Sequence, residues 1–218
     1  MVDIAIDIGQ TQARARISHQ DGSTRELEIG GFAYGSNVLD EIVHIVEEVA
    51  RRHGLDDVGA VAVGSTGLHG HVPPVDDVLS RLHRSLGTTL VVVADDAVSA
   101  YLGARGDRDG VVVAAGTGIV GLAHGPAGAA RVDGVGSMIG DEGSGWWIGR
   151  RGLIAAISAA DGRRDASPAL LRRLEARFGA VAEFPSRLAA EASPVSTVAS
   201  FAKDVADVAR DGDTLSAR

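Results

Sequence analysis

The sequence predicts an α/β protein with two lobes, and three observations lead to that prediction. Short β-rich segments alternate with segments of helical spacing over the first half of the chain, which is typical of α/β architectures. Two β-rich segments, at 2–8 and 111–115, each run into a turn that contains glycine and threonine. A polar, charged connector at 106–110 lies between these two modules. We therefore expect an N-terminal lobe at 1–107 and a C-terminal lobe at 108–218.

Two apolar periodicities predict the elements of the N-terminal lobe. Alternating or β-branched runs indicate strands, and apolar residues three or four apart indicate helices. In chain order we expect strands at 2–8, 13–18 and 25–29, a helix at 36–52, a strand at 60–63, a helix at 76–85, a strand at 89–94 and a helix at 97–104. The turn signal Asp21-Gly22 joins the second and third strands.

The C-terminal lobe repeats the opening pattern and then becomes helical. Strands are expected at 111–115, 119–123 and 129–132, and the pattern is helical from Trp146 onward. Three prolines mark helix starts or breaks in that region: Pro168, Pro185 and Pro194. We also expect the helices around 170–178 and 198–208 to expose apolar faces if the segment that packs against them is absent.

Composition excludes several classes of function. The 218 residues carry a net charge of −8, which argues against a nucleic-acid surface and against binding to an anionic membrane. The chain has no cysteine, which removes disulfides, thiolate metal sites and iron–sulfur clusters. No apolar run spans a bilayer, and the first residues lack the basic start of a signal peptide. We therefore expect a cytoplasmic protein without nucleic-acid or membrane partners.

The first strand ends at a carboxylate followed by a glycine turn, in the order Asp7, Ile8, Gly9, Gln10, Thr11. Such a turn can present backbone N–H groups to a phosphate, while Asp7 holds a hydrated Mg²⁺. An ordinary hairpin has the same pattern, so this turn alone leaves both interpretations open.

A second turn of the same kind, Gly116-Thr117-Gly118, follows the strand predicted at 111–115. Its functional interpretation is a second phosphate cradle, and its structural interpretation is a plain hairpin. Two aspartates, Asp95 and Asp96, follow the strand predicted at 89–94. One of them can cap the next helix, which leaves the other to accept a proton from a hydroxyl that attacks a γ-phosphate.

The stretch Gly140–Gly149 is the most informative part of the chain. Two carboxylates, Asp141 and Glu142, lie between glycines and run directly into a helix-like segment. Glycine lets the backbone approach a ligand closely, and the first N–H groups of a helix are unpaired. A carboxylate there can accept hydrogen bonds from ligand hydroxyls, whereas the simpler interpretation is a turn that caps a helix. Asn37 likewise suits a sugar or an N-cap.

In this order the motifs resemble those of the actin-like ATPase-fold sugar kinases, specifically the N-acetylglucosamine kinase branch. That branch is grouped with the ATPase activators of benzoyl-CoA reductase and 2-hydroxyacyl-CoA dehydratase. The resemblance is in good register from residue 2 to about 155, and its most specific match is Gly140–Gly149 with Trp147 on the motif's tryptophan. It implies a two-lobed, ribonuclease H-like fold. It also implies ATP-dependent phosphorylation of a sugar hydroxyl, most of all by an N-acetylglucosamine or hexosamine kinase.

The resemblance also implies roles for individual residues. The ATP-binding positions are Asp7, Gly9, Gln10, Thr11, Gly116, Thr117 and Gly118. Asp7 is implied to act on Mg²⁺, through water, and Asp96 to be the catalytic base. The positions that contact the sugar are Asn37, Asp96, Gly134, Val135, Gly136 and Asp141. Glu142 adjoins that contact, and its role stays open.

Three positions depart from the family pattern. Gln10 stands where many members have glycine, and Ile119 replaces the usual serine, which removes a hydroxyl near the phosphates. Val135 stands where the sugar kinases often have tryptophan, so the sugar loses a stacking partner and specificity changes. The sugar itself is therefore not determined.

The family's adenosine loop, a Gly-Gly turn, and its closing helix are expected after residue 210, and the sequence contains neither. We therefore expect the second lobe to be incomplete. A fragment, a differently built nucleotide site and a non-catalytic sugar-binding or sensor protein all stay open as explanations. The activator branch needs cysteines for its iron–sulfur cluster, and the absence of cysteine argues against it. The oligomeric state is also open, with a homodimer as one possibility.

Overall fold

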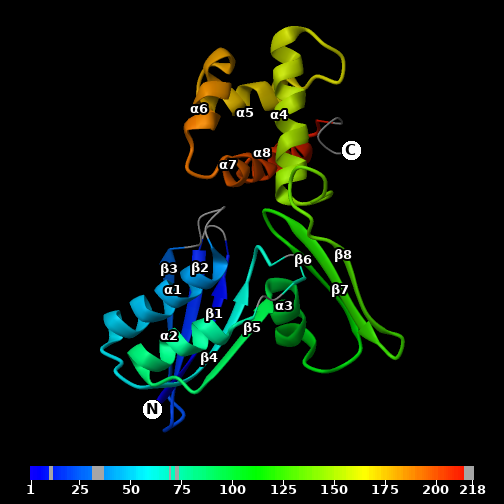
Figure 1. Ribbon diagram of the computed structural model, residues 1–218. Helices are drawn as coiled ribbons and strands as arrows, with labels where there is room; N and C mark the ends of the chain where they lie inside the picture. The colour runs from blue at the N-terminus through cyan, green and yellow to red at the C-terminus, as the bar shows by residue number, and fades with distance from the viewer. Residues whose placement is uncertain (10–11, 31–36, 69, 72–73, 214–218) are drawn as a thin grey trace. The chain divides into compact units, whose positions relative to one another are not determined.

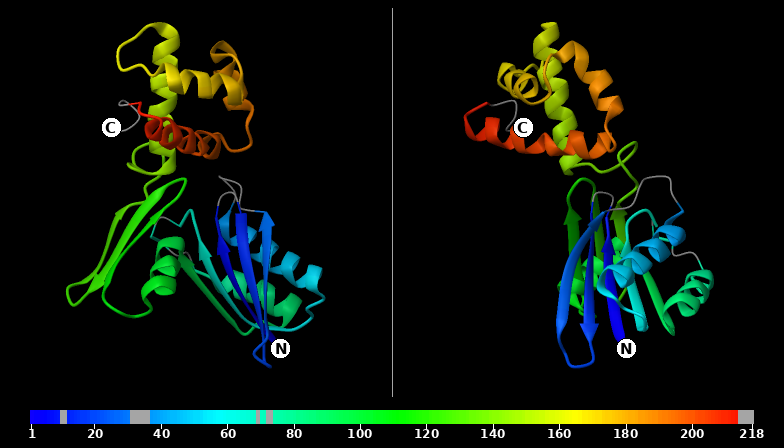
Figure 2. Two further views of the ribbon diagram at one scale, coloured as in Figure 1. Left: turned by 180° about the vertical axis from the view of Figure 1, so that it is seen from behind. Right: turned by 90° about the vertical axis from the view of Figure 1, so that its left-hand side faces the viewer.

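The computed structural model describes residues 1–9, 12–30, 37–68, 70–71 and 74–213 (Figure 1). The chain forms two compact units, Met1–Asp109 and Gly110–Arg218. Each unit has its own β-sheet, helices and hydrophobic core, and Figure 2 shows the same elements from two further sides.

The first unit is built on a five-stranded sheet. In chain order its elements are β1 (Val2–Ile8), β2 (Gln12–His19), β3 (Thr24–Gly30), α1 (Val38–His53), β4 (Val58–Ser65), α2 (Asp76–Leu86), β5 (Leu90–Asp95) and α3 (Asp96–Arg105). The strand order is β3-β2-β1-β4-β5. β1, β2 and β3 pair antiparallel, whereas β1, β4 and β5 are parallel to one another. The carboxyl ends of these three parallel strands therefore lie at one edge of the sheet (Figure 1).

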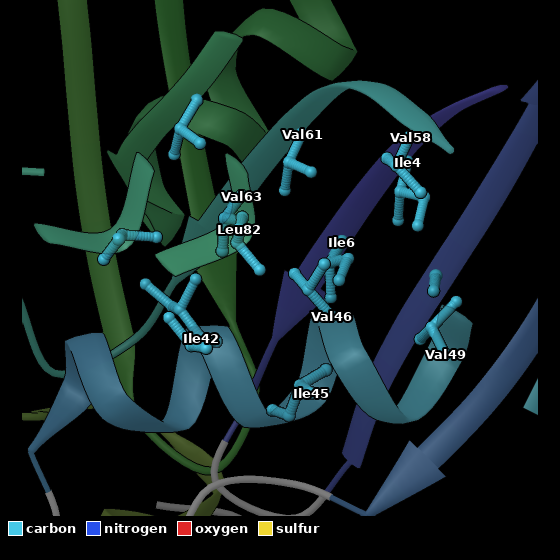
Figure 3. Close-up of a cluster of buried hydrophobic side chains, with 14 of the residues drawn as sticks. Ile4, Ile6, Ile42, Ile45, Val46, Val49, Val58, Val61, Val63 and Leu82 are labelled. Atoms are coloured by element: carbon cyan, nitrogen blue, oxygen red, sulfur yellow. The ribbon is translucent and has the colours of Figure 1, made fainter. Parts of the chain in front are cut away.

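Helices α1 and α2 cover one face of this sheet and close the core. β1 alternates strictly between buried and exposed residues, as a strand with one buried face must. The apolar residues of α1 recur at helical spacing and lie along its buried side. The side chains that meet there include Ile4, Ile6, Ile42, Ile45, Val46, Val49, Val58, Val61, Val63 and Leu82 (Figure 3).

Local signals set the two ends of α1. Asn37 is extended, and its side-chain oxygen accepts a hydrogen bond from the Leu39 N–H at 3.0 Å, which is an N-cap. Gly54 ends the helix in the left-handed region, with φ of 62°. The helix begins at Val38, after its capping residue, and the start predicted at residue 36 lies outside the described residues.

The other face of the sheet carries α3 and an open groove. Gly64 of β4 lies beneath α3, and a Cβ on it would overlap the side chain of Ser99. The groove has a volume of about 1080 Å³. Its lining includes Ala5, Asp7, Arg14, Arg16, Ala62, Val92, Ser99 and Leu102. The Asp7 carboxylate therefore opens on the face that α1 and α2 leave uncovered.

The second unit begins with an antiparallel meander and continues as helices. Its elements are β6 (Gly110–Ala115), β7 (Ile119–Gly125), β8 (Gly128–Asp133), α4 (Gly145–Asp161), α5 (Pro168–Phe178), the 3₁₀ helix η1 (Val181–Glu183), α6 (Phe184–Ala190), α7 (Pro194–Ser200) and α8 (Ala202–Arg210). The strand order is β6-β7-β8. Helices α5, α7 and α8 pack on α4, the longest helix of the unit.

Two glycines of α4 allow this close packing. A Cβ on Gly149 would overlap the Val198 carbonyl oxygen and would lie 3.3 Å from the Ala202 backbone nitrogen. A Cβ on Gly152 would meet the side chains of Val205 and Phe201. Exposed apolar faces at 170–178 and 198–208 were expected only if no segment packed against these helices. The structure shows that α4 covers them, since the following residues are all buried around it: Leu170, Leu174, Val198, Phe201, Val205 and Val208.

Proline positions match the helix starts of this unit. Pro168 and Pro194 begin α5 and α7, and Pro185 lies in the first turn of α6. The predicted helix at 198–208 is interrupted at Phe201, which ends α7 and precedes α8. Among the described residues, no helix has both the length and the apolar composition needed to cross a bilayer.

Candidate active site

Two groups of polar side chains stand out, one in each unit. In the first unit, the register aligns Ile8, Ser65 and Asp95 across the ends of the parallel strands. Asp7 and Asp96 therefore lie next to this row, one residue before it on β1 and one residue after it on β5. Carboxyl ends of parallel strands are where α/β proteins build ligand sites.

Of the two adjacent aspartates, Asp95 is the structural one. It is 3% exposed, and its carboxylate accepts a hydrogen bond from the Ala97 N–H at 3.1 Å, which caps α3. Its other oxygen accepts a hydrogen bond from the Gly70 N–H at 2.9 Å. Both oxygens are thus engaged with backbone, and the carboxylate left over for chemistry is that of Asp96.

Asp96 has the electrostatics of a base. Burial, followed by the negative charge of Asp95, raises the pKa of Asp96 to about 6. The side chain of Thr66 hydrogen-bonds the carboxylate and acts in the opposite direction. A carboxylate with this pKa is ionised at neutral pH and still accepts a proton more readily than an exposed aspartate does.

We expect Asp95→Asn to lower the pKa of Asp96. Asparagine is also a good N-cap, so the helix start is retained while the neighbouring charge disappears. Because burial is the larger cause, the pKa should fall from about 6 but stay above its ordinary value. Titration of the Asp96 carboxyl carbon by NMR measures this directly. An unchanged pKa would show that the charge of Asp95 does not act on Asp96.

The turn after β1 is tight. The Gly9 N–H donates to the Gln12 carbonyl at 3.0 Å, and a Cβ on Gly9 would lie 3.0 Å from the same oxygen. Gln10 and Thr11, predicted to bind ATP, lie outside the described residues. Asp7 is exposed at the end of β1. No group of three or more His, Asp or Glu side chains is gathered for a metal in the described part of the chain.

Asn37 lies at the start of α1, where it makes the N-cap described above. Its side-chain oxygen is engaged with the Leu39 N–H, which matches the structural interpretation of this residue. A sugar contact through Asn37 stays a prediction.

In the second unit, the turn between β6 and β7 is joined to the start of α4. The N–H groups of Gly145 and Trp146 donate to the carbonyls of Gly116 and Thr117, at 2.8 and 3.0 Å. These bonds use carbonyls of the turn, and the Gly116 N–H donates to the Gly118 carbonyl at 2.8 Å. Within the described residues, no acceptor is found for the N–H groups of Thr117 and Gly118. Free amides of a glycine turn are suited to binding an anion.

Asp141 connects the Gly140–Gly149 stretch to the same turn. It is 7% exposed, and its carboxylate accepts a hydrogen bond from the Ile119 N–H at 3.0 Å. A Cβ on Gly118 would lie 2.7 Å from the same carboxylate, so glycine is needed there. Ser144 then caps α4 by accepting a hydrogen bond from the Trp147 N–H at 3.2 Å.

Asp133 is a further polar residue of this region, and it was not predicted from the sequence. Its carboxylate accepts hydrogen bonds from the backbone N–H groups of Gly134 at 2.7 Å, Asp141 at 2.9 Å and Glu142 at 3.3 Å. These bonds, the one from Asp141 above all, lower the pKa of Asp133. The signal was present in the sequence, because Asp133 follows the strand predicted at 129–132 and precedes a glycine, as Asp7 precedes the first glycine turn.

The residues predicted to contact the sugar flank a shallow pocket. Gly134, Val135 and Gly136 lie in the loop between β8 and α4, and Val135 is half exposed. A pocket of about 490 Å³ is lined by Ser137, Met138, Ile139, Gly140, Glu142, Trp146, Trp147 and Arg150. The guanidinium carbon of Arg150 lies 5.6 Å from the centre of the Trp146 ring. Apolar and aromatic surface with a few polar groups is typical of small-molecule sites.

These features agree with a known family. The family model of the BadF/BadG/BcrA/BcrD ATPases matches residues 4–218. The chain belongs to this family. The family prediction from the ordered glycine and carboxylate motifs is thereby confirmed.

Relatives in this family include sugar kinases. An N-acetylmuramic acid/N-acetylglucosamine kinase of Clostridium acetobutylicum is 29% identical over 171 residues, which are 73% of this chain. The chain spans 55% of the length of that relative. A solved structure from Chromobacterium violaceum, described as a candidate N-acetylglucosamine kinase, is 26% identical with a TM-score of 0.73, and the match covers 99% of this chain and 76% of that one.

More distant structures share the fold. A candidate N-acetylglucosamine kinase of Porphyromonas gingivalis gives a TM-score of 0.74 at 22% identity, covering 95% of this chain and 73% of that one. A glucokinase of the ROK family from Streptomyces griseus gives 0.56 at 19% identity, over 99% and 73%. The predicted α/β, actin-like ATPase fold is therefore confirmed.

Proposed function

We propose that this chain contains the catalytic base and phosphate-binding turns of an ATP-dependent kinase that phosphorylates a hydroxyl group of N-acetylglucosamine or a related amino sugar. The observation that supports this most is Asp96, a half-buried carboxylate with a raised pKa at the carboxyl end of the parallel strands. The similarity to the Clostridium kinase supports the amino-sugar class.

In this proposal Asp96 faces the sugar. It accepts the proton of the sugar hydroxyl as that oxygen attacks the γ-phosphorus of ATP. The bond from the γ-phosphorus to the oxygen that bridges it to the β-phosphate breaks, and ADP leaves with the electron pair of that bond. Catalysis of this reaction depends mainly on positioning and on neutralising charge, so one base with a suitable pKa is sufficient acid–base machinery.

Asp7 and the two glycine turns act on ATP. The N–H groups of Thr117 and Gly118 bind phosphate oxygens. Phosphate binding by the turn at 9–11 stays a prediction, because residues 10 and 11 lie outside the described part of the chain. Asp7 is an exposed carboxylate, and no group of three or more His, Asp or Glu side chains is gathered for a metal in the described residues. One carboxylate fits a hydrated Mg²⁺ that would be bound mainly by water and by the phosphates of ATP. Such an ion would neutralise phosphate charge.

The loop from Gly134 to Asp141 acts on the sugar. Its exposed backbone and the neighbouring pocket provide polar groups beside Trp146 and Trp147, and aromatic faces suit the apolar side of a sugar ring. Because residue 135 is valine and not tryptophan, we propose that specificity for the sugar depends on the side chains of Trp146 and Trp147. ATP is a cytoplasmic substrate, and we place the reaction in the cytoplasm.

The decisive experiment is sugar-dependent ADP release with Mg-ATP. We expect turnover with one of N-acetylglucosamine, N-acetylmuramic acid, glucosamine, N-acetylmannosamine or glucose, and the amino sugars should be preferred. Because this chain spans little more than half of the Clostridium relative, the same assay should be run on the product of the whole gene. Sugar binding by calorimetry without ADP release from either protein would support the sensor interpretation and contradict the kinase.

A further inference from the structure

The side chain of Asp133 bonds both ends of the loop between β8 and α4, and Arg131 donates to the carbonyls of Asp133 and Gly134 at its start. Asp133 bonds the N–H of Gly134 at the start of the loop and the N–H groups of Asp141 and Glu142 at its end. A carboxylate has two acceptor oxygens and no donor, so it can receive all three N–H groups without conflict. A Cβ on Gly140 would lie 2.5 Å from the Asp133 carboxylate, so the loop backbone passes directly over it.

The contacts continue from this loop to the second glycine turn. Asp133 orients the backbone of Asp141, and the carboxylate of Asp141 receives the Ile119 N–H at the end of that turn. Just after the loop, the N–H groups of Gly145 and Trp146 donate to the carbonyls of the same turn. Asp133 therefore lies at the head of a continuous series of hydrogen bonds that ends at the turn.

The backbone at Asp133 also favours a particular set of residues. Its φ is 58°, in the left-handed region where aspartate, asparagine and glycine are tolerated best. Asp141 has φ of 64°, so both ends of this connection are held in the same uncommon conformation. Such conformations persist where the surrounding bonds determine them. Here the Asp133 carboxylate makes such bonds together with the Arg131 guanidinium, which donates to the Asp133 and Gly134 carbonyls.

We propose that Asp133 is a positioning residue of the kinase, whose carboxylate holds the sugar loop at 134–143 in register with the phosphate-binding turn at 116–118. This inference rests on the proposed function. Asp133 does not touch the reacting atoms. It acts through Asp141 and the Ile119 N–H, so that sugar and γ-phosphate are presented to each other with fixed geometry. Displacements of about 1 Å in such a site cost on the order of 10²-fold in rate.

Two variants test this, each with a matched control. Asp133→Asn keeps one acceptor oxygen, and Asp133→Gly removes both while keeping a residue suited to the left-handed backbone. Asp165 has φ of 55° and is exposed, so Asp165→Asn and Asp165→Gly make the same chemical changes away from the loop. Circular dichroism melting identifies any variant that fails to fold.

We expect Asp133→Gly to lower kcat/KM for both sugar and ATP by about 100-fold and Asp133→Asn by about 10-fold. The pH below which kcat/KM falls should be the same as in the wild type, because Asp96 is unchanged. The Asp165 variants should keep wild-type constants. Wild-type constants in Asp133→Gly would overturn the inference, and so would an equal loss in Asp165→Gly.

A readout independent of catalysis separates this inference from the proposed function. Amide hydrogen exchange at Asp141 and Gly134 should be at least 10-fold faster in Asp133→Gly, and the emission of Trp146 and Trp147, the only tryptophans, should shift. If these changes are found in a chain that releases no ADP, the proposed kinase activity is contradicted, while the role of Asp133 in holding the loop is supported. Unchanged exchange at both amides would refute the role of Asp133 whatever the activity.

Discussion

Replacing Asp96 with asparagine is expected to lower sugar-dependent ADP release by about 10²–10⁴-fold. The amide has the size and shape of the carboxylate but cannot accept the hydroxyl proton. Sugar affinity, measured by calorimetry without ATP, should change little, because the amide still offers a hydrogen-bonding oxygen. Asp56→Asn, at an exposed aspartate of the same unit, is the matched control and should keep full activity.

The pH profile gives the same proposal a second test. Because the pKa of Asp96 is raised to about 6, its basic form is lost below that pH. For the wild-type protein, log kcat/KM should rise with a slope near one up to about pH 6 and then level off. A profile that levels off below pH 5, or near-native turnover in Asp96→Asn, would remove Asp96 from the role of base.

Stability should move in the opposite direction to activity. A carboxyl group with a raised pKa favours the folded state while it is protonated, and that contribution is lost as the pH rises from 3.8 to about 6. Asp96→Asn removes the buried charge and should raise the free energy of unfolding by roughly 1–2 kcal/mol at pH 8, but not at pH 3. Such a gain at pH 8 would show that this charge is retained at a cost to stability.

The second large effect is expected at Gly149. A methyl group there would overlap the carbonyl oxygen of Val198, which belongs to the backbone of a packed helix and cannot rotate away. Gly149→Ala should therefore force α7 away from α4 and lower the free energy of unfolding of the second unit by about 3 kcal/mol. Urea unfolding followed by tryptophan emission measures it, since Trp146 and Trp147 lie on the same helix.

Gly103→Ala is the control for this experiment. Gly103 also lies inside a helix, and nothing is within 4 Å of the position its Cβ would take. Alanine should there stabilise α3 by about 0.5–1 kcal/mol, because it is the better helix former. Equal stability of Gly149→Ala and the wild type would show that the α4–α7 contact is looser than described.

The sequence predicted most of the first unit because its signals are local. The alternation over 2–8 and the helical spacing that begins after Asn37 each depend on neighbouring residues, and both elements are found. The local pattern at Asp95-Asp96 predicted one cap and one free carboxylate, and only the resemblance implied that Asp96 is the base. The structure makes Asp95 the cap through the Ala97 N–H, and its second oxygen is engaged by the Gly70 N–H, 25 residues earlier in the chain.

The parts that escaped prediction depend on contacts between distant segments. The break at Phe201 and the burial of Val205 arise because α4 presents two glycines to the last helices. The role of Asp133 depends on amides eight and nine residues away, which no periodicity reports. The roles of individual residues in binding sugar and ATP stay predictions until the variants are measured.

The strand pairings have a consequence for how the protein is made. In the second unit, β6, β7 and β8 pair with their immediate neighbours in the chain, so each hairpin can form as soon as it leaves the ribosome. β1 instead pairs with β4, in a register that joins Val2 to Val58, and β4 in turn needs β5. Distant pairings of this kind slow folding. β1 can pair early with its neighbour β2, but the side of β1 that pairs with β4 stays unpaired until β4 has been synthesised.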